Sequence, residues 1–192
     1  MPKTNFHRYH DNPVVKHFWG KTNVTDATAY FYFHKGDRVQ QLIHSLKYKG
    51  DKEVGHILGN MFGCDLRESE NYNQIDFLIP VPLHKSRKYS RGYNQSEMIA
   101  KGLNESMEIP VETNILLREK ATETQTKKRR YTRYENMKEV FIIKNAEHLT
   151  GKHFLLVDDV ITTGSTLAAC AEKLLQIKDA RVSIAALAYA HH

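Results

Sequence analysis

The segment from residue 153 to residue 166 constrains the fold of this chain more than any other part of it. It opens with an apolar run, residues 153–157, that has no helical period and predicts a short strand buried on both faces, as in the middle of a parallel sheet. Asp158 and Asp159 follow, where we expect this strand to end. Beyond a run of small residues, apolar side chains return at helical spacing, at Leu167, Ala171, Leu174 and Leu175. The segment therefore predicts a strand, a polar loop and the N-terminus of a helix.

The polar loop lies where α/β proteins bind ligands, outside the carboxyl end of a strand. Its free N–H groups and the positive end of the helix dipole favour a phosphate, and Gly164 allows the backbone to approach closely. Hydroxyl donors are offered by Thr162, Thr163, Ser165 and Thr166. The carboxylates of Asp158 and Asp159 instead suit neutral hydroxyls, or a magnesium-bound group beside the phosphate. Loop and acids together predict a ribose 5-phosphate held at both ends.

A plainer interpretation is that the two aspartates only cap a helix in an ordinary strand–helix turn. However, the succession of an apolar strand, paired acids and Thr-Thr-Gly-Ser-Thr resembles the phosphoribosyl pyrophosphate signature of the type I phosphoribosyltransferases. Two other phosphate-binding motifs are excluded, because a Walker loop would need Gly-Lys-Ser/Thr and a dinucleotide fingerprint would need its glycines.

The length of the chain, 192 residues, suits one α/β domain with a small extension. Lys and Arg exceed Asp and Glu by 28 to 22, a formal net charge of +6 that fits a polyphosphate substrate as well as nucleic acid. The two cysteines, Cys64 and Cys170, predict neither a disulfide framework nor a cysteine zinc site. Without an apolar run of membrane-spanning length or a signal-peptide core, we expect a cytoplasmic protein without membrane insertion. Nothing in the sequence indicates an oligomeric state.

Residues 1–27 are polar and aromatic with little period, and predict an irregular N-terminal arm anchored by Trp19. Residues 28–192 form the main domain. Apolar stripes predict one helix after Asp37, another over residues 54–62 and a third after Asn94. Pro80 should end a strand near Ile79. The other expected strands cover residues 28–34, 111–117, 140–143 and 182–188, the last of them beside the strand that carries the two aspartates.

Two groups of cations stand out. The first follows the strand near Ile79 and contains Lys85, Arg87, Lys88 and Arg91, with no acidic residue among them. Arginine grips phosphate bidentately, so these side chains are candidates for binding pyrophosphate, although a solvated basic surface would have the same composition. The second group lies in residues 118–136, which lack an apolar stripe; it consists of Arg118, Lys120, Lys127, Lys128, Arg129, Arg130 and Arg133.

The segment 118–136 predicts a loop that is mobile without ligand, because its cations repel one another and nothing apolar offsets the entropy of ordering it. A bound pyrophosphate would let it close, exclude water and stabilise the leaving group. A basic loop of this kind also suits the backbone of nucleic acid.

With these residues in view, nearly the whole chain resembles the ComF family, phosphoribosyltransferase-like proteins associated with competence for DNA uptake. The matching segments are residues 46–50, 80–83 with Arg87, 91–95, 117–118, 124–125, 133–136 and 157–166. The resemblance implies a type I phosphoribosyltransferase-like fold: a mostly parallel twisted sheet with helices on both faces and a small hood. Many members begin with a four-cysteine zinc module that is absent here, so the chain either starts just after that module or is a member that lacks it.

The resemblance implies binding of phosphoribosyl pyrophosphate with magnesium and transfer of its phosphoribosyl group to an acceptor that no motif identifies. The expected catalytic residues are Asp158, Asp159, Arg118 and Lys120. The expected substrate contacts are Thr162, Thr163, Gly164, Ser165 and Thr166 for the 5-phosphate, and Lys85, Arg87 and Arg91 for the pyrophosphate. No side-chain metal site is expected, since magnesium would arrive with the ligand near the two aspartates. The alternative is an accessory protein without turnover that binds single-stranded DNA, or DNA-uptake proteins, on the same fold.

Overall fold

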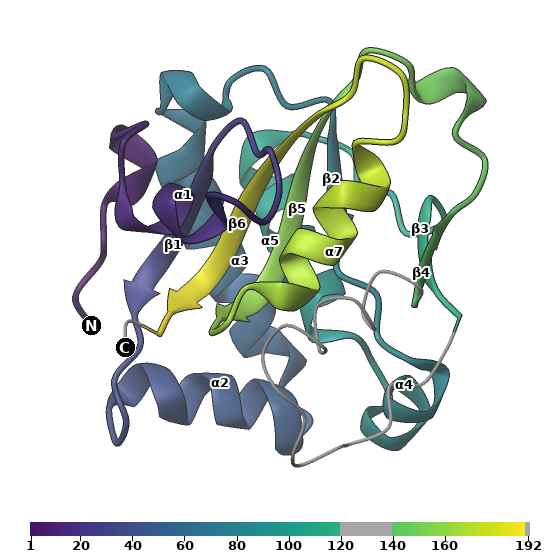
Figure 1. Ribbon diagram of the computed structural model, residues 1–192. Helices are drawn as coiled ribbons and strands as arrows, with labels where there is room; N and C mark the ends of the chain where they lie inside the picture. The colour runs from purple at the N-terminus through teal and green to yellow at the C-terminus, as the bar shows by residue number, and fades with distance from the viewer. Residues whose placement is uncertain (120–139, 191–192) are drawn as a thin grey trace.

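The computed structural model describes residues 1–119 and 140–190, and its centre is a four-stranded sheet (Figure 1). The strands are β1 (Ala27–Tyr32), β2 (Phe77–Pro80), β5 (His153–Ile161) and β6 (Arg181–Tyr189), and they lie in the order β1-β6-β5-β2. All three pairings in this sheet are parallel. A second, two-stranded sheet pairs β3 (Leu116–Arg118) antiparallel with β4 (Phe141–Ile143). The parallel sheet expected from the sequence is confirmed.

Helices cover both faces of the four-stranded sheet (Figure 1). One face packs against α2 (Arg38–Tyr48), α3 (Lys52–Arg67) and α5 (Gln95–Met107). The other face packs against α1 (Pro13–Phe18), α7 (Ser165–Leu174), β3 and β4. The short α4 (Lys85–Arg91) buries none of its residues. Within the described residues, 3₁₀ turns span Phe6–Arg8, Glu70–Tyr72 and Glu147–Leu149. No helix in the described part of the chain is long and apolar enough to cross a membrane.

Two strands differ from the expectation in where they begin or end. β5 does not stop before the acids: Asp158 pairs in register with Ala186, and the strand continues to Ile161. The apolar pattern underestimated it because the ladder to β6 holds the polar residues in the sheet as well. The expected strand over residues 111–117 is reduced to an isolated parallel bridge at Val111 and to β3. β2, by contrast, ends at Pro80, one residue beyond the end expected near Ile79, and it lies at an edge of the sheet.

The N-terminal arm contains a short helix, α1, whose N-cap is Asn12. Pro13 at its first position has no N–H to satisfy, and the Asn12 side chain accepts hydrogen bonds from the next two N–H groups. Val14 and Phe18 are fully buried against the sheet, whereas Trp19 is 66% exposed. The expectation that Trp19 anchors the arm is therefore wrong. The helical turn directs Val14 and Phe18 inward and leaves Trp19 at the C-cap, beneath the Lys16 ammonium.

Glycines allow α3 and α5 to pack backbone against backbone. A Cβ atom added at Gly102 would lie 2.0 Å from the carbonyl oxygen of His56, and one added at Gly59 would lie 2.3 Å from that of Ile99. Only glycine fits so close an approach. The contact fixes the position of α5, whose N-terminus lies beside the acids of β5, since Ser96 in its first turn bonds to Asp158.

Candidate functional site

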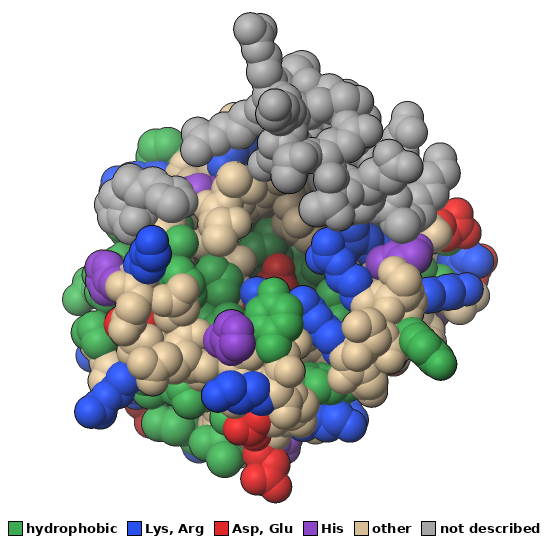
Figure 2. All heavy atoms as spheres, turned by 90° about the horizontal axis from the view of Figure 1, so that it is seen from below, with side chains coloured by type: hydrophobic (Ala, Val, Ile, Leu, Met, Phe, Trp, Pro, Cys, Tyr) green, Lys and Arg blue, Asp and Glu red, His purple; other side chains and the backbone are tan. Residues whose placement is uncertain are grey.

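The carboxyl ends of the parallel strands form a hollowed face, seen from below in Figure 2. An acidic side chain is visible in the hollow, with Lys and Arg side chains close by. This is the edge of an open α/β sheet at which ligands bind. The residues that contribute to it come from β5, from the loop before α7, from α2, α4 and α5, and from β3.

Asp158 is partly buried and its Oδ1 accepts two hydrogen bonds, from Ser96 Oγ at 3.0 Å and from the N–H of Asp159 at 2.9 Å. Burial raises the pKa of Asp158 to about 7, and the negative charge of Asp159 adds to the rise. Burial and the neighbouring charge therefore favour the protonated form of Asp158 more than for an ordinary aspartate. Perturbation of this kind, from burial together with a neighbouring like charge, is common where a carboxylate faces a ligand.

Asp159 is held differently, by an ion pair. The ammonium of Lys47 lies 2.8 Å from Asp159 Oδ1, and the Asp159 residue is only 8% exposed. Lys47 belongs to the last turn of α2 and was not among the residues expected at the site. The only signal was its place in the matching segment 46–50. The acid pair thus carries an internal counter-ion, the ammonium of Lys47.

The loop between β5 and α7 is short and polar. Gly164 is the N-cap of α7 and takes a φ of 70°, a left-handed conformation that favours glycine. Thr163 Oγ1 lies 3.2 Å from Ser165 Oγ and accepts the N–H of Ser165 at 3.4 Å. Thr162 is exposed, while Ser165 and Thr166 open the ten-residue helix. The five residues expected to contact a 5-phosphate are therefore together at a helix N-terminus, which begins shortly after the acids.

The expected pyrophosphate cations lie on α4, beside the end of α2. Lys85 and Arg87 are exposed. The guanidinium of Arg91 lies 5.3 Å from the centre of the Tyr48 ring, a cation–π contact at the rim of the site. Lys88, which the sequence analysis described as lacking an acidic neighbour, pairs at 2.8 Å with Glu97 of α5. The ion pair explains why only part of this basic segment is available for an anion.

Arg118, at the end of β3, connects the two groups of cations. Burial lowers its pKa, and the nearby charge of Arg87 lowers it further, so the two guanidinium groups are close enough to repel. Arg118 also lies 5.6 Å from the centre of the Phe141 ring. A polyanion between Arg87 and Arg118 would relieve this repulsion. Lys120, the remaining cations of segment 118–136 and its expected mobility lie outside the described residues.

No cluster of three His, Cys, Asp or Glu side chains within residues 1–119 and 140–190 could hold a metal ion. Asp158 and Asp159 supply two carboxylates, one of them paired with Lys47. Magnesium prefers six oxygen ligands, so these acids fit it only if a ligand and water supply the rest.

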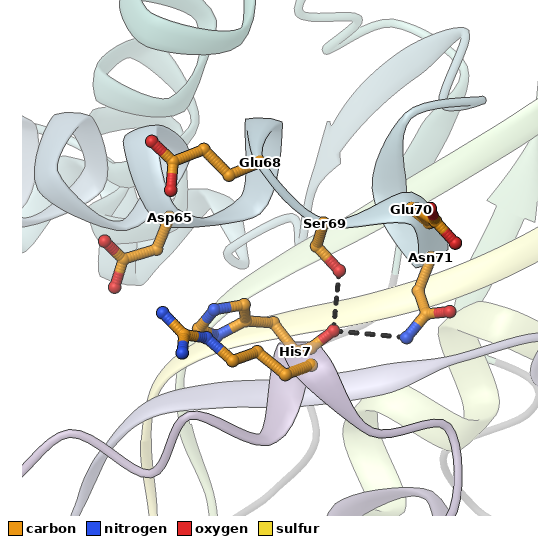
Figure 3. A pocket seen from close by; sticks show the side chains of 7 residues that line it. His7, Asp65, Glu68, Ser69, Glu70 and Asn71 are labelled. Atoms are coloured by element: carbon orange, nitrogen blue, oxygen red, sulfur yellow. Dashed lines mark hydrogen bonds between the residues drawn. The ribbon is translucent and has the colours of Figure 1, made fainter.

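A separate pocket of about 310 Å³ lies on the amino side of the sheet, where residues 65–71 lead into β2 (Figure 3). His7 faces the end of α3 there, and its carbonyl oxygen accepts hydrogen bonds from Ser69 and Asn71. Asp65, Glu68 and Glu70 line the pocket, which disfavours a phosphate. No residue expected from the sequence to bind a ligand lines it. We therefore place the candidate site at the carboxyl ends of the strands and not in this pocket.

Comparison with known proteins finds a matching domain family and related bacterial proteins. The family described as phosphoribosyl transferase domain matches residues 94–192. The DNA utilization protein YhgH of Escherichia coli O157:H7 is 32% identical over 146 residues, 74% of this chain and 63% of that protein. Competence protein F of Haemophilus influenzae is 31% identical over 153 residues, 78% of this chain and 67% of that protein. The chain thus spans about 63% of the length of the DNA utilization proteins that it matches.

Solved structures give weaker likenesses. One is an allosteric regulatory enzyme of purine biosynthesis, 21% identical, with a TM-score of 0.45 over 68% of this chain and 26% of that one. Another is adenine phosphoribosyltransferase from Saccharomyces cerevisiae, 17% identical, with a TM-score of 0.38 over 79% of this chain and 68% of that one.

Proposed function

The chain belongs to the ComF family of phosphoribosyltransferase-domain proteins, and from this membership we propose that it binds phosphoribosyl pyrophosphate with magnesium and transfers the phosphoribosyl group to an acceptor. One observation carries the proposal: a pair of acids and a hydroxyl-rich helix N-terminus follow each other at the carboxyl end of the central strand β5. These groups suit the ribose hydroxyls and the 5-phosphate of a single ligand. The cations of α4 and β3 supply the complementary charge for its pyrophosphate.

In this assignment Asp158 and Asp159 accept hydrogen bonds from the ribose hydroxyls, and residues 162–166 bind the 5-phosphate. Lys47, released from Asp159, becomes one more cation for the ligand. Arg87, Arg91 and Lys85 take the pyrophosphate, and Arg118 with Lys120 completes its enclosure.

Catalysis in this assignment is electrostatic. As the bond to pyrophosphate lengthens, positive charge grows on the ribose ring and negative charge on the leaving group. The carboxylates at the end of β5 stabilise the ring, while Arg87 and Arg118 stabilise the leaving group. Magnesium, when bound, supplies additional neutralisation of the pyrophosphate oxygens. The acids hold the ribose in the orientation that the reaction needs, since both are fixed within a paired strand.

Calorimetry tests the binding half of the proposal. Phosphoribosyl pyrophosphate with magnesium should bind the native protein at about pH 8, where the raised pKa leaves Asp158 mostly ionised. A double variant, Asp158→Asn with Asp159→Asn, should bind it much more weakly. Asp76→Asn is the matched control, because Asp76 lies at the amino end of the sheet, paired with Lys152. Undiminished affinity in the double variant would remove the assignment.

A second candidate function is binding of single-stranded nucleic acid without turnover. Tyr89 on α4 is 93% exposed and Tyr48 on α2 is 66% exposed, and both accompany the cations at the site. Exposed aromatic rings among cations are a surface on which unpaired bases stack. The names of two relatives, a DNA utilization protein and a competence protein, also favour a role with DNA.

Titration of a short single-stranded DNA at low and high salt tests this second function. Binding to phosphates should weaken steeply with salt, because each neutralised phosphate releases counter-ions. A Tyr48→Ala, Tyr89→Ala variant should lose the stacking part at either salt concentration. Absence of binding at low salt would exclude this function, and displacement of DNA by phosphoribosyl pyrophosphate would show that both ligands share the site.

A further inference from the structure

The N-terminal arm reaches the loop before α7 from outside the segment that the domain family matches. Lys21 follows α1, and its ammonium donates to the carbonyl oxygens of His17, at 2.8 Å, and of Thr163, at 3.1 Å. Lys21 and Thr163 are 142 residues apart in the chain. One bond therefore joins the arm to the backbone of the loop proposed to bind the 5-phosphate.

The same part of the arm forms a wall against the loop at Gly164. A Cβ atom added there would lie 2.8 Å from Cδ2 of His17 and 3.1 Å from Cε1 of Phe18. Phe18 is fully buried, and the His17 ring meets Tyr189 of β6 edge-on at 5.7 Å between ring centres. Because these rings are fixed by the core and by β6, the wall is rigid. The path of the loop is thus set from the arm as well as from β5.

The bond to the Thr163 carbonyl has an electrostatic consequence. A loop that binds an anion presents N–H groups, and a carbonyl oxygen that turned toward the ligand would repel it. The Lys21 ammonium holds this carbonyl and offsets its partial negative charge. It also places a full positive charge next to the loop, in addition to the partial charges of the helix dipole.

We propose that Lys21 is a positioning residue for the phosphate loop, and that through it the N-terminal arm tunes the site for a ligand with a terminal monophosphate. The inference rests on the proposed function, since it takes residues 162–166 as the place of the 5-phosphate. It assigns the arm a part in binding that the family match over residues 94–192 does not include. The pyrophosphate end of the site, on α4 and β3, lies outside the reach of this contact.

The test compares Lys21→Met with Lys16→Met. Lys16 lies on α1, five residues before Lys21, but it pairs with Asp11 and lies over the Trp19 ring, away from the loop. Affinities are measured for ribose 5-phosphate, pyrophosphate and phosphoribosyl pyrophosphate. Lys21→Met should lower the affinity for ribose 5-phosphate and for phosphoribosyl pyrophosphate about tenfold, the effect of one lost charge-assisted hydrogen bond. The affinity for pyrophosphate should fall less than about twofold. Lys21→Arg should recover part of the loss, and Lys16→Met should behave like the native protein. Equal weakening of all three ligands would overturn the inference.

Amide hydrogen exchange of residues 162–166 without ligand separates this inference from the proposed function. Lys21→Met should speed exchange in the loop about tenfold relative to Lys16→Met, with an unchanged urea midpoint. Unchanged exchange in Lys21→Met overturns the inference even if phosphoribosyl pyrophosphate binds. If Lys21→Met speeds exchange in the loop but the native protein binds no phosphoribosyl ligand, the contact between the arm and the loop is supported and the proposed function is excluded instead.

Discussion

Replacing Asp158 with Asn should stabilise the free protein while it damages ligand binding. Asn has nearly the same size, and its Oδ1 can still accept from Ser96 and from the N–H of residue 159. What the change removes is a partly buried negative charge beside a second one. Sites of this kind exchange stability for function, because a group suited to a ligand is unfavourable when the ligand is absent.

The size of the effect follows from the pKa of Asp158, about 7 in the folded protein against an ordinary value of 3.8. Between these values the folded state retains a proton that the unfolded state has lost, so stability falls as pH rises from about 4 to about 7 and stays low above that. One pKa unit corresponds to about 1.36 kcal/mol, which gives an upper limit of about 4 kcal/mol. Solvent screening of the exposed part reduces this, and we expect about 2 kcal/mol.

Urea denaturation at about pH 4.5 and about pH 8.5 measures the difference, and thermal unfolding should show a gain of about 4–8 °C at the higher pH. The gain should nearly vanish at the lower pH. Asp76→Asn is a control of opposite sign. Burial opposes ionisation of Asp76, but the N–H of His153 at 2.8 Å and the Lys152 ammonium at 2.9 Å lower its pKa overall, so its loss should cost stability at high pH. If Asp158→Asn gained nothing at about pH 8.5, the reasoning on this charge would be refuted.

Three further outcomes are expected. Gly102→Ala should lower the free energy of unfolding in urea by about 3 kcal/mol or more, because the new methyl group would meet the backbone of His56. Gly55→Ala should cost less, since its methyl group meets the movable end of the Leu46 side chain at 2.9 Å. Equal costs would contradict the close helix contact. Burial and the charge of Arg181 lower the pKa of His153 to about 4, so stability should fall by about 2 kcal/mol between about pH 7 and pH 5, and His153→Gln should flatten that slope. If the protein has the proposed activity, Arg118→Ala should reduce kcat by a larger factor than it weakens binding, because the leaving group gains charge in the transition state; equal losses would place Arg118 in ground-state binding only.

The strongest sequence patterns predicted the elements that bury apolar side chains at regular intervals, on one face of a helix or along a strand. The apolar run of β5, the apolar segment of β6 and the stripes of α2 and α3 each depend on contacts with the sheet, so period and burial agree. α4 was not expected, because a helix that buries no residue has no apolar period to detect. α1 is too short for a period, and its packing becomes clear only when the sheet is in place.

The acids and the loop of the candidate site could be predicted from the sequence because they lie close together in the chain. Lys47 was not, because its bond to Asp159 joins residues 112 positions apart and depends on where the end of α2 lies over the sheet. Lys21 was not predicted either, because its bond to the Thr163 carbonyl also joins distant segments of the chain. Ser96 follows the expected helix start at Asn94, yet its role depends on the glycine contact that brings α5 close to α3. Contacts between distant segments leave no local pattern in one sequence.

The strand order has a consequence for synthesis of the protein. β1 is made first among the strands, but its neighbour in the four-stranded sheet is β6, the last. At about 5–20 residues per second, translation from Tyr32 to Tyr189 leaves β1 without that neighbour for roughly 10–30 s. During this interval the aromatic segment Ala27–Tyr32 lacks the partner strand that it has in the folded sheet. The central sheet therefore closes only after translation is almost complete, because its edge strand β1 pairs with the last strand to be made.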